Sequence, residues 1–167
     1  FNEPRWLPDG SSLMTWGRDL KGRSGIYRID AQTGAVSFVT ESPINRVQVS
    51  PDGRKIYYNI AQGGFAERDV ASGAVREVLP RFASRGNPEL SPDGRFLATV
   101  VDDARAKTSA VMLAPVAGGE PRELLRVSLP ERFAAFANMS WMPDSQGVIV
   151  VKGNGDFEAP KPGDRLE

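Results

Sequence analysis

Four aspartates recur along the chain in one short context, a Pro-Asp pair that is followed by Gly in three of the copies. They are Asp9, Asp52, Asp93 and Asp144. A carboxylate repeated in this way could act as a general acid or base, or bind a metal, but both roles need a second group nearby. Each copy lacks the ladder of oxygen ligands that a calcium loop supplies at alternate positions. We therefore interpret these aspartates as turn residues and predict no catalytic residue, no metal and no cofactor.

The composition narrows the chemistry further. The 167 residues include no His and no Cys, which excludes within this chain a Ser-His-Asp or Cys-His relay, a His-ligated metal and a zinc-thiolate site. No Gly-x-Ser-x-Gly elbow and no phosphate-binding loop is present. The 21 basic and 21 acidic side chains cancel, so the overall charge does not favour nucleic acid as a partner. No apolar run reaches the length of about 18 residues that a membrane span needs.

The spacing of the repeated corners predicts the architecture. Their prolines lie about 40 to 50 residues apart, which is the repeat length of propeller blades. Between the corners, short segments rich in Val, Ile, Tyr and Phe alternate with Gly-containing turns, as in "AERDVASGAVREVL" at 66–79. Each unit therefore predicts a blade of four antiparallel strands. We expect an all-β propeller with about three and a half blades, at approximately 1–41, 42–80, 81–127 and, incomplete, 128–167.

The strands can be placed within these units from the apolar segments. The second unit predicts strands at 45–50, 55–61, 65–70 and 75–79, and the third at 88–91, 96–101, 109–114 and 122–127. The first unit begins with an inner strand at 4–7, and the fourth shows strands at 139–142 and 147–152. Three and a half blades do not close a ring, and the chain begins without Met. We therefore expect a fragment of a propeller with six to eight blades, or self-association through open blade edges.

The corners have the chemistry of tight turns. In "SPDG", Ser can start a type I turn, Pro presets the second position, Asp suits the third and Gly adopts a positive φ. We assign structural roles to Pro51, Asp52, Gly53, Pro92, Asp93 and Gly94.

Together, "SPDGRxIxY" and the following "IYxID…TGxV" pattern resemble the TolB-like propeller repeat, which is also similar to the propellers of prolyl-oligopeptidase-type peptidases. The resemblance covers nearly the whole chain. It implies a bacterial, periplasmic or extracytoplasmic scaffold that binds other proteins. A WD-repeat propeller fits less well, because the Trp-Asp and Gly-His signatures are missing.

Candidate binding residues follow from sorting the loops by face. The Pro-Asp-Gly and Thr-Gly turns leave the blades on one face, and the longer loops and blade connections leave on the other. Because the tight turns serve geometry, we expect binding on the longer-loop face. The loops predicted on that face are 17–25, 80–87, 102–109, 129–138 and 153–165. The predicted partner-binding residues are Arg18, Arg23, Arg81, Arg85, Arg105, Lys107, Arg132 and Phe133. The alternative is that these arginines are ordinary surface residues and that the phenylalanines fill gaps between blades.

Two functional hypotheses remain open. The first is a non-catalytic module, part of a larger protein, that binds a protein or peptide on its longer-loop face or in its central channel. The alternative is the gating propeller of a prolyl-oligopeptidase-like serine hydrolase whose catalytic domain lies outside this chain. A propeller lyase or lactonase with a metal in its channel is a third, weaker hypothesis, since the chain lacks His and paired carboxylates.

Overall fold

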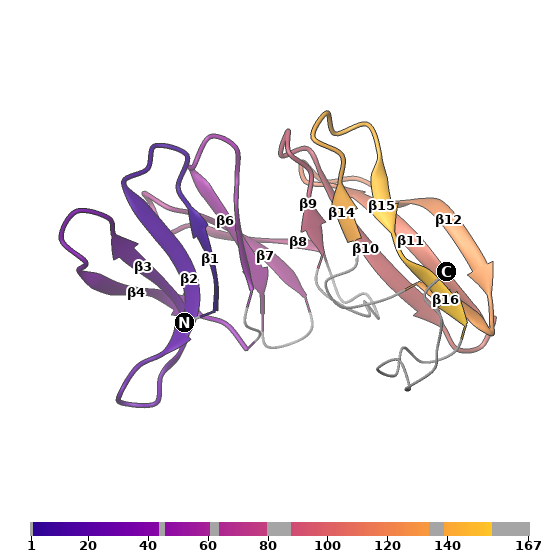
Figure 1. Ribbon diagram of the computed structural model, residues 1–167, viewed down its shortest axis with the longest axis horizontal. Helices are drawn as coiled ribbons and strands as arrows, with labels where there is room; N and C mark the ends of the chain where they lie inside the picture. The colour runs from indigo at the N-terminus through magenta and orange to yellow at the C-terminus, as the bar shows by residue number, and fades with distance from the viewer. Residues whose placement is uncertain (1, 44–45, 61–63, 80–87, 134–138, 155–167) are drawn as a thin grey trace, which may run out of the picture.

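The computed structural model describes residues 2–43, 46–60, 64–79, 88–133 and 139–154. All regular secondary structure within these residues is β-strand, arranged in antiparallel sheets that follow one another along the long axis (Figure 1). The predicted all-β class and the four-stranded antiparallel unit are confirmed. No helix capable of spanning a membrane occurs in this described part of the chain.

Three sheets contain four strands each in sequence order, so each is a meander. Blade 1 consists of β1 (Asn2–Trp6), β2 (Ser12–Arg18), β3 (Ser24–Asp30) and β4 (Val36–Glu41). Blade 2 consists of β5 (Val47–Val49), β6 (Lys55–Asn59), β7 (Phe65–Asp69) and β8 (Val75–Leu79). Blade 3 consists of β9 (Glu89–Leu90), β10 (Phe96–Asp103), β11 (Thr108–Pro115) and β12 (Arg122–Ser128).

The described residues of blade 4 form two two-stranded sheets from the short strands β13 (Glu131–Phe133), β14 (Met139–Trp141), β15 (Val148–Val150) and β16 (Lys152–Asn154). β14 pairs with β15, and β13 pairs with β16. The sequence analysis assigned 129–138 to a loop, and β13 corrects that assignment. The strand forms because its backbone pairs with β16, while Phe133 packs against blade 3.

The hairpin between β10 and β11 is tighter than predicted. Its register is continuous from Phe96 opposite Pro115 to Asp103 opposite Thr108. The segment 102–109, predicted as a loop on the longer-loop face, is therefore strand at 102–103 and 108–109 and closes in a turn at 104–107. Arg105 and Lys107 occupy that turn, and Lys107 has a positive φ of 53°.

Hydrophobic cores lie between successive blades, because neighbouring residues of a strand point to opposite faces of the sheet. In β6, Ile56 and Tyr58 pack toward blade 1, and Tyr57 packs toward blade 3. The first core contains Leu7, Met14, Ile26, Val47, Ile56, Tyr58 and Ala66. The second contains Tyr57, Phe65, Leu79, Leu97, Ala114 and Val116. A smaller core of Val100, Val111 and Phe133 joins blades 3 and 4.

The Pro-Asp-Gly corners repeat the same backbone hydrogen bonds in every blade. The amide of the last corner residue donates to the carbonyl of the first, at 2.9 Å from Gly53 to Ser50 and 2.8 Å from Gly94 to Ser91. Gly53 and Gly94 have φ angles of 71° and 73°, as the turn prediction requires. The prolines, aspartates and glycines of 50–53 and 91–94 therefore lie in tight turns.

Each glycine also touches the corner of the preceding blade. A Cβ atom on Gly53 would lie 2.9 Å from Cδ of Pro8, and one on Gly94 would lie 2.8 Å from Cδ of Pro51. In blade 4, Ser145 replaces this glycine and keeps a positive φ of 61°. Its hydroxyl accepts a hydrogen bond from the Asp93 amide at 3.0 Å. The corners are therefore turns and contacts between blades at the same time.

Candidate functional site

Three hollows lie between successive blades on the tight-turn face, the face formed by the Pro-Asp-Gly corners and the turns between each blade's third and fourth strands. The groove between blades 1 and 2 encloses about 450 Å³, and the groove between blades 2 and 3 about 540 Å³. The groove between blades 3 and 4 is smaller, about 170 Å³. The first two volumes fall in the range of binding sites for small ligands or peptide side chains.

An arginine from the preceding blade lines each of these grooves. Arg28 on β3 lines the first groove, Arg76 on β8 the second and Arg122 on β12 the third. The Nε of Arg28 donates to the Ser12 hydroxyl at 2.8 Å, which holds its side chain across blade 1. A guanidinium, a strong donor to carboxylates, therefore lines every groove, although Arg28 comes from a third strand and Arg76 and Arg122 from fourth strands.

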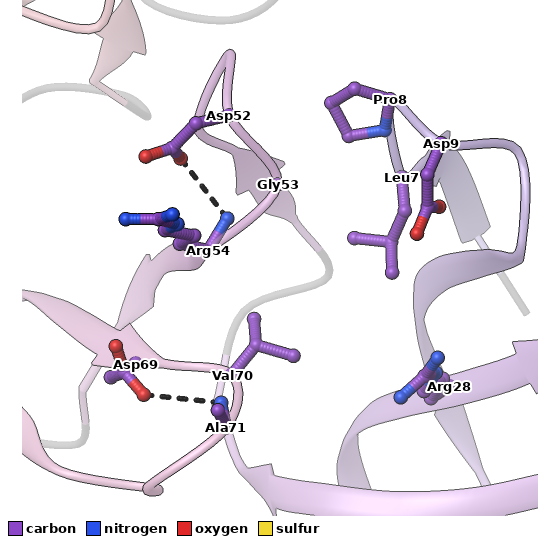
Figure 2. Close-up of a pocket in the computed structure, with 10 residues that line it drawn as sticks. All are labelled: Leu7, Pro8, Asp9, Arg28, Asp52, Gly53, Arg54, Asp69, Val70 and Ala71. Atoms are coloured by element: carbon purple, nitrogen blue, oxygen red, sulfur yellow. Dashed lines mark hydrogen bonds between the residues drawn. The ribbon is translucent and has the colours of Figure 1, made fainter.

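In the first groove the aspartates serve the turns (Figure 2). Asp52 accepts a hydrogen bond from the Arg54 amide at 3.0 Å, and Asp69 accepts one from the Ala71 amide at 3.1 Å. The Ser50 hydroxyl, which donates to Asp52, is the main cause of the lowered pKa of that carboxyl group. The Ser72 amide does the same for the pKa of Asp69.

These aspartates are poorly suited to proton transfer near neutral pH, because their pKa values lie below the ordinary range and their oxygens are already engaged. Within the described ranges, no group of three or more His, Cys, Asp or Glu side chains is placed to hold a metal ion. The floor between the two corners is apolar, and the side chains of Leu7 and Val70 point toward each other there (Figure 2).

The second groove contains a network of charged side chains around Glu67. Its carboxylate accepts hydrogen bonds from Lys55 Nζ at 2.7 Å, Tyr57 Oη at 3.1 Å and Arg76 Nη2 at 3.1 Å. Burial disfavours the charged form of Glu67, but the three donors outweigh burial and lower its pKa. The same Arg76 nitrogen donates to the Val116 carbonyl of blade 3 at 2.9 Å. Burial and the neighbouring Glu67 carboxylate raise the pKa of Tyr57, so its phenol stays protonated.

The innermost strands carry a second charged cluster, which the sequence analysis missed. Arg46, just before β5, forms ion pairs with Glu3 of β1, at 3.3 Å between Nε and Oε2, and with Glu89 of β9. Burial raises the pKa of Glu89, an effect that the Arg46 charge partly offsets. The Gln48 amide also bridges to blade 3, where it contacts the Pro88 carbonyl and accepts from the Leu90 amide at 2.6 Å.

The signal for this cluster is the position of each residue relative to its corner proline. Glu3 and Arg46 stand at the same repeat position, and Arg5, Gln48 and Glu89 share another two residues later. Since alternate residues of a strand share a face, these positions bring polar side chains together along the inner strands. Aligning the repeats on their corner prolines would therefore have predicted a polar inner face, but not which of its residues pair with each other.

The residues predicted on the longer-loop face do not form one described cluster. Arg18 donates from Nε to the Gly22 carbonyl at 3.0 Å, and Arg23 stacks over the Phe38 ring at 4.0 Å, so both stabilise the β2–β3 hairpin. Arg105 and Lys107 belong to the β10–β11 hairpin at the other end of the long axis (Figure 1).

The other predicted residues of that face have different outcomes. Phe133 is only 1% exposed in the core between blades 3 and 4, so its predicted role in partner binding is wrong. The alternative, that a phenylalanine fills an inter-blade gap, is correct for this residue. Arg132 lies on β13 and is half-buried. Arg81 and Arg85 lie outside the described residues, and their role stays a prediction.

No protein-family model matches the sequence, and a search of curated proteins finds no match. Solved structures do resemble it. A protein designated TolB from Agrobacterium tumefaciens is 20% identical and superposes with a TM-score of 0.69, over 96% of this chain and 57% of its own. Oligogalacturonate lyase from Vibrio parahaemolyticus is 15% identical, with a TM-score of 0.67 over 79% of this chain and 41% of its own.

Dipeptidyl peptidase 4 from Porphyromonas gingivalis is 16% identical and gives a TM-score of 0.56, over 90% of this chain and 29% of its own. The chain therefore has the fold of a TolB-like propeller, which peptidase propellers share. It spans between 29% and 57% of the length of these three structures, so it corresponds to part of such a propeller. At these identities the likeness establishes the fold alone.

Proposed function

We propose that this chain is a non-catalytic propeller module of a larger protein and that it binds a polypeptide through the tight-turn face. The observation that carries the proposal is the repetition of one groove between each pair of blades, each with an arginine of the preceding blade in its wall. Repeated grooves at blade spacing suit an extended partner that places one side chain in each. This moves the expected binding surface from the longer-loop face to the opposite one.

The character of the face supports a polypeptide over a nucleic acid. The arginines alternate with the corner aspartates, so the face carries both signs of charge. A phosphate backbone would need a predominantly basic surface. Arginine and exposed apolar groups together are typical of protein interfaces. The engagement of the corner carboxylates in turns supports a binding role over acid-base chemistry.

Site-specific photo-crosslinking would test this proposal in cells that express the whole protein. A photoreactive amino acid replaces Arg54 beside the first groove, Arg95 beside the second or Gln146 beside the third. A matched control replaces Arg105, which is exposed in the β10–β11 hairpin. We expect the three groove positions to crosslink to the same polypeptide and the control to give no such adduct. Adducts at Arg105 alone would contradict the proposal and would indicate that the partner binds the longer-loop face.

A further inference from the structure

We propose that the groove between blades 2 and 3 binds a carboxylate of an acidic peptide segment, held by Lys55 and Arg76, with an apolar neighbour of that carboxylate against Phe96 and Pro115. The inference rests on the proposed polypeptide-binding function and specifies the chemistry of the partner at one groove. It is carried by the donors, the charge and the apolar lining of this groove, and the first groove differs from it in charge.

The two cations retain hydrogen-bonding capacity after their contacts with Glu67. Lys55 uses one donor on Glu67 at 2.7 Å, although an ammonium has three. Arg76 uses Nη2 for both Glu67 and the Val116 carbonyl, which leaves its remaining guanidinium donors for another acceptor. Their side chains are 40% and 46% exposed, whereas Glu67 is 9% exposed beneath them. The unused donors are therefore accessible from the groove and the carboxylate is covered.

The local charge favours an anion. Lys55 and Arg76 share a single carboxylate, so these three side chains together carry one net positive charge. Of the rim aspartates, Asp93 pairs with Arg95 at 2.7 Å, whereas Asp52 keeps its negative charge and accepts a hydrogen bond from the Ser50 hydroxyl. The groove as a whole is therefore neutral, but the side chains exposed next to its covered carboxylate are cationic. A carboxylate placed between the Lys55 ammonium and the Arg76 guanidinium would form charge-assisted hydrogen bonds with both.

The first groove carries a net negative charge. Three carboxylates, Asp9, Asp52 and Asp69, line it together with Arg28 and Arg54. An acidic group would meet repulsion there from the aspartates. The chemistry of the repeat is therefore not uniform, and an acidic side chain fits the second groove better.

Apolar side chains also line this groove. Phe96, Pro115 and Val116 line it on blade 3, and Pro51 lines it on blade 2. The Arg95 guanidinium lies over the Phe96 ring, 5.6 Å from its centroid, and fixes that edge of the groove. The volume of about 540 Å³ accommodates more than the acidic group alone. We therefore expect the acidic residue to be preceded or followed by an aliphatic or aromatic one.

Two capped peptides provide the probe, acetyl-Gly-Leu-Glu-Gly-amide and its isosteric control acetyl-Gly-Leu-Gln-Gly-amide. Each is titrated into the ¹⁵N-labelled protein at neutral pH, and amide shifts are followed by NMR. We expect millimolar binding of the Glu peptide, with the largest shifts at Lys55, Arg76 and Val116. The Gln peptide should bind about tenfold more weakly, since it loses the charge-assisted hydrogen bonds. Equal affinities, or no shifts at these residues with either peptide, would overturn the inference.

Substitutions in the cluster of Lys55, Glu67 and Arg76 provide a second test. One of them is expected to tighten peptide binding, a result that loss of folding cannot produce. Glu67→Gln keeps the shape of the cluster and removes the charge that Lys55 and Arg76 share, so the Glu peptide should bind several-fold more tightly. Arg76→Gln should abolish the preference for Glu over Gln, and Arg105→Gln on the other face should leave it unchanged. A purely structural cluster predicts no tightening in Glu67→Gln, and that result would also overturn the inference. If it fails while groove crosslinks persist, the proposed function stands and only the acidic partner is rejected.

Discussion

The Pro-Asp-Gly corners and the β2–β3 hairpin, on opposite faces of the blades, are held in place by different kinds of contact. On the tight-turn face, Gly94 lies against Pro51 of the preceding blade, and the Asp93 amide bonds to Ser145 of the following one. On the longer-loop face, the β2–β3 hairpin closes on itself, because Asp19 accepts hydrogen bonds from the amides of Lys21 and Arg23. Changes at these corners should therefore propagate between blades, and changes in the β2–β3 hairpin should stay local.

The largest effect is expected where a corner glycine touches the preceding blade. Gly94→Ala puts a Cβ atom 2.8 Å from Cδ of Pro51 and also forces a positive φ on alanine. We expect the free energy of unfolding to fall by about 3 kcal/mol. Gly10→Ala is the matched control, since Gly10 has a φ of 68° and no atom within 4 Å of the added Cβ. Its cost should be about 1 kcal/mol, from backbone strain alone.

Urea denaturation of both variants measures the difference. If Gly94→Ala and Gly10→Ala were equally destabilised, the Gly94 corner would be an ordinary turn, and the contrast between the two faces would lose its basis.

The inner strands provide a further contact between blades, because Arg46 of blade 2 pairs with Glu3 of blade 1 and Glu89 of blade 3. Arg46→Met leaves the Glu89 carboxylate, 17% exposed, without its main partner. We expect a loss of about 2 kcal/mol in the free energy of unfolding, below the cost of breaking a fully buried pair. Arg5→Met is the control, since Arg5 and Glu3 are 3.9 Å apart and both 45% exposed. Its effect should stay below about 0.5 kcal/mol, and a similar loss in both variants would rule out a special role for Arg46.

The longer-loop face should respond less. Asp19→Ala removes the acceptor for two amides and the ion pair with Arg23, at 3.2 Å. We expect a smaller loss in the free energy of unfolding than for Arg46→Met. Hydrogen exchange should accelerate at Lys21 and Arg23, while the Gly53 corner amide keeps its protection. Acceleration at Gly53 as well would show that the hairpin is coupled to the blades.

The same contrast explains which features could be predicted from the sequence and which could not. The corners and the four-stranded units were predictable because turn chemistry and alternation are local: Pro51, Asp52 and Gly53 act within a few residues. The Arg46 cluster and the Glu67 network were not, since each depends on how residues far apart in sequence meet across strands or blades. Phe133 was wrongly assigned to partner binding because a position in a predicted loop does not determine the direction of a side chain. The pairing of β13 with β16 places Phe133 in the core.

The smallest expected effect is a pH dependence of stability from the corner carboxylates. The Ser91 hydroxyl, followed by the Arg95 amide and side chain, lowers the pKa of Asp93 to about 2, against an ordinary value of 3.8. The unfolded chain therefore takes up the proton first as the pH falls. The stabilisation by Asp93 is complete above about pH 4 and is lost as the pH falls toward 2.

Because this side chain is 30% exposed, solvent screening should keep the effect below about 1 kcal/mol. Asp93→Asn keeps the oxygen that accepts from Ser91 and Arg95 but does not titrate in this range. Urea denaturation at pH 5 and at pH 2.5 should thus show a smaller loss of stability in Asp93→Asn than in the parent protein. An unchanged difference would mean that Asp93 positions the corner by geometry alone. The link between blades would then lie in its backbone amide on Ser145 and in the Gly94 contact, which carry no charge.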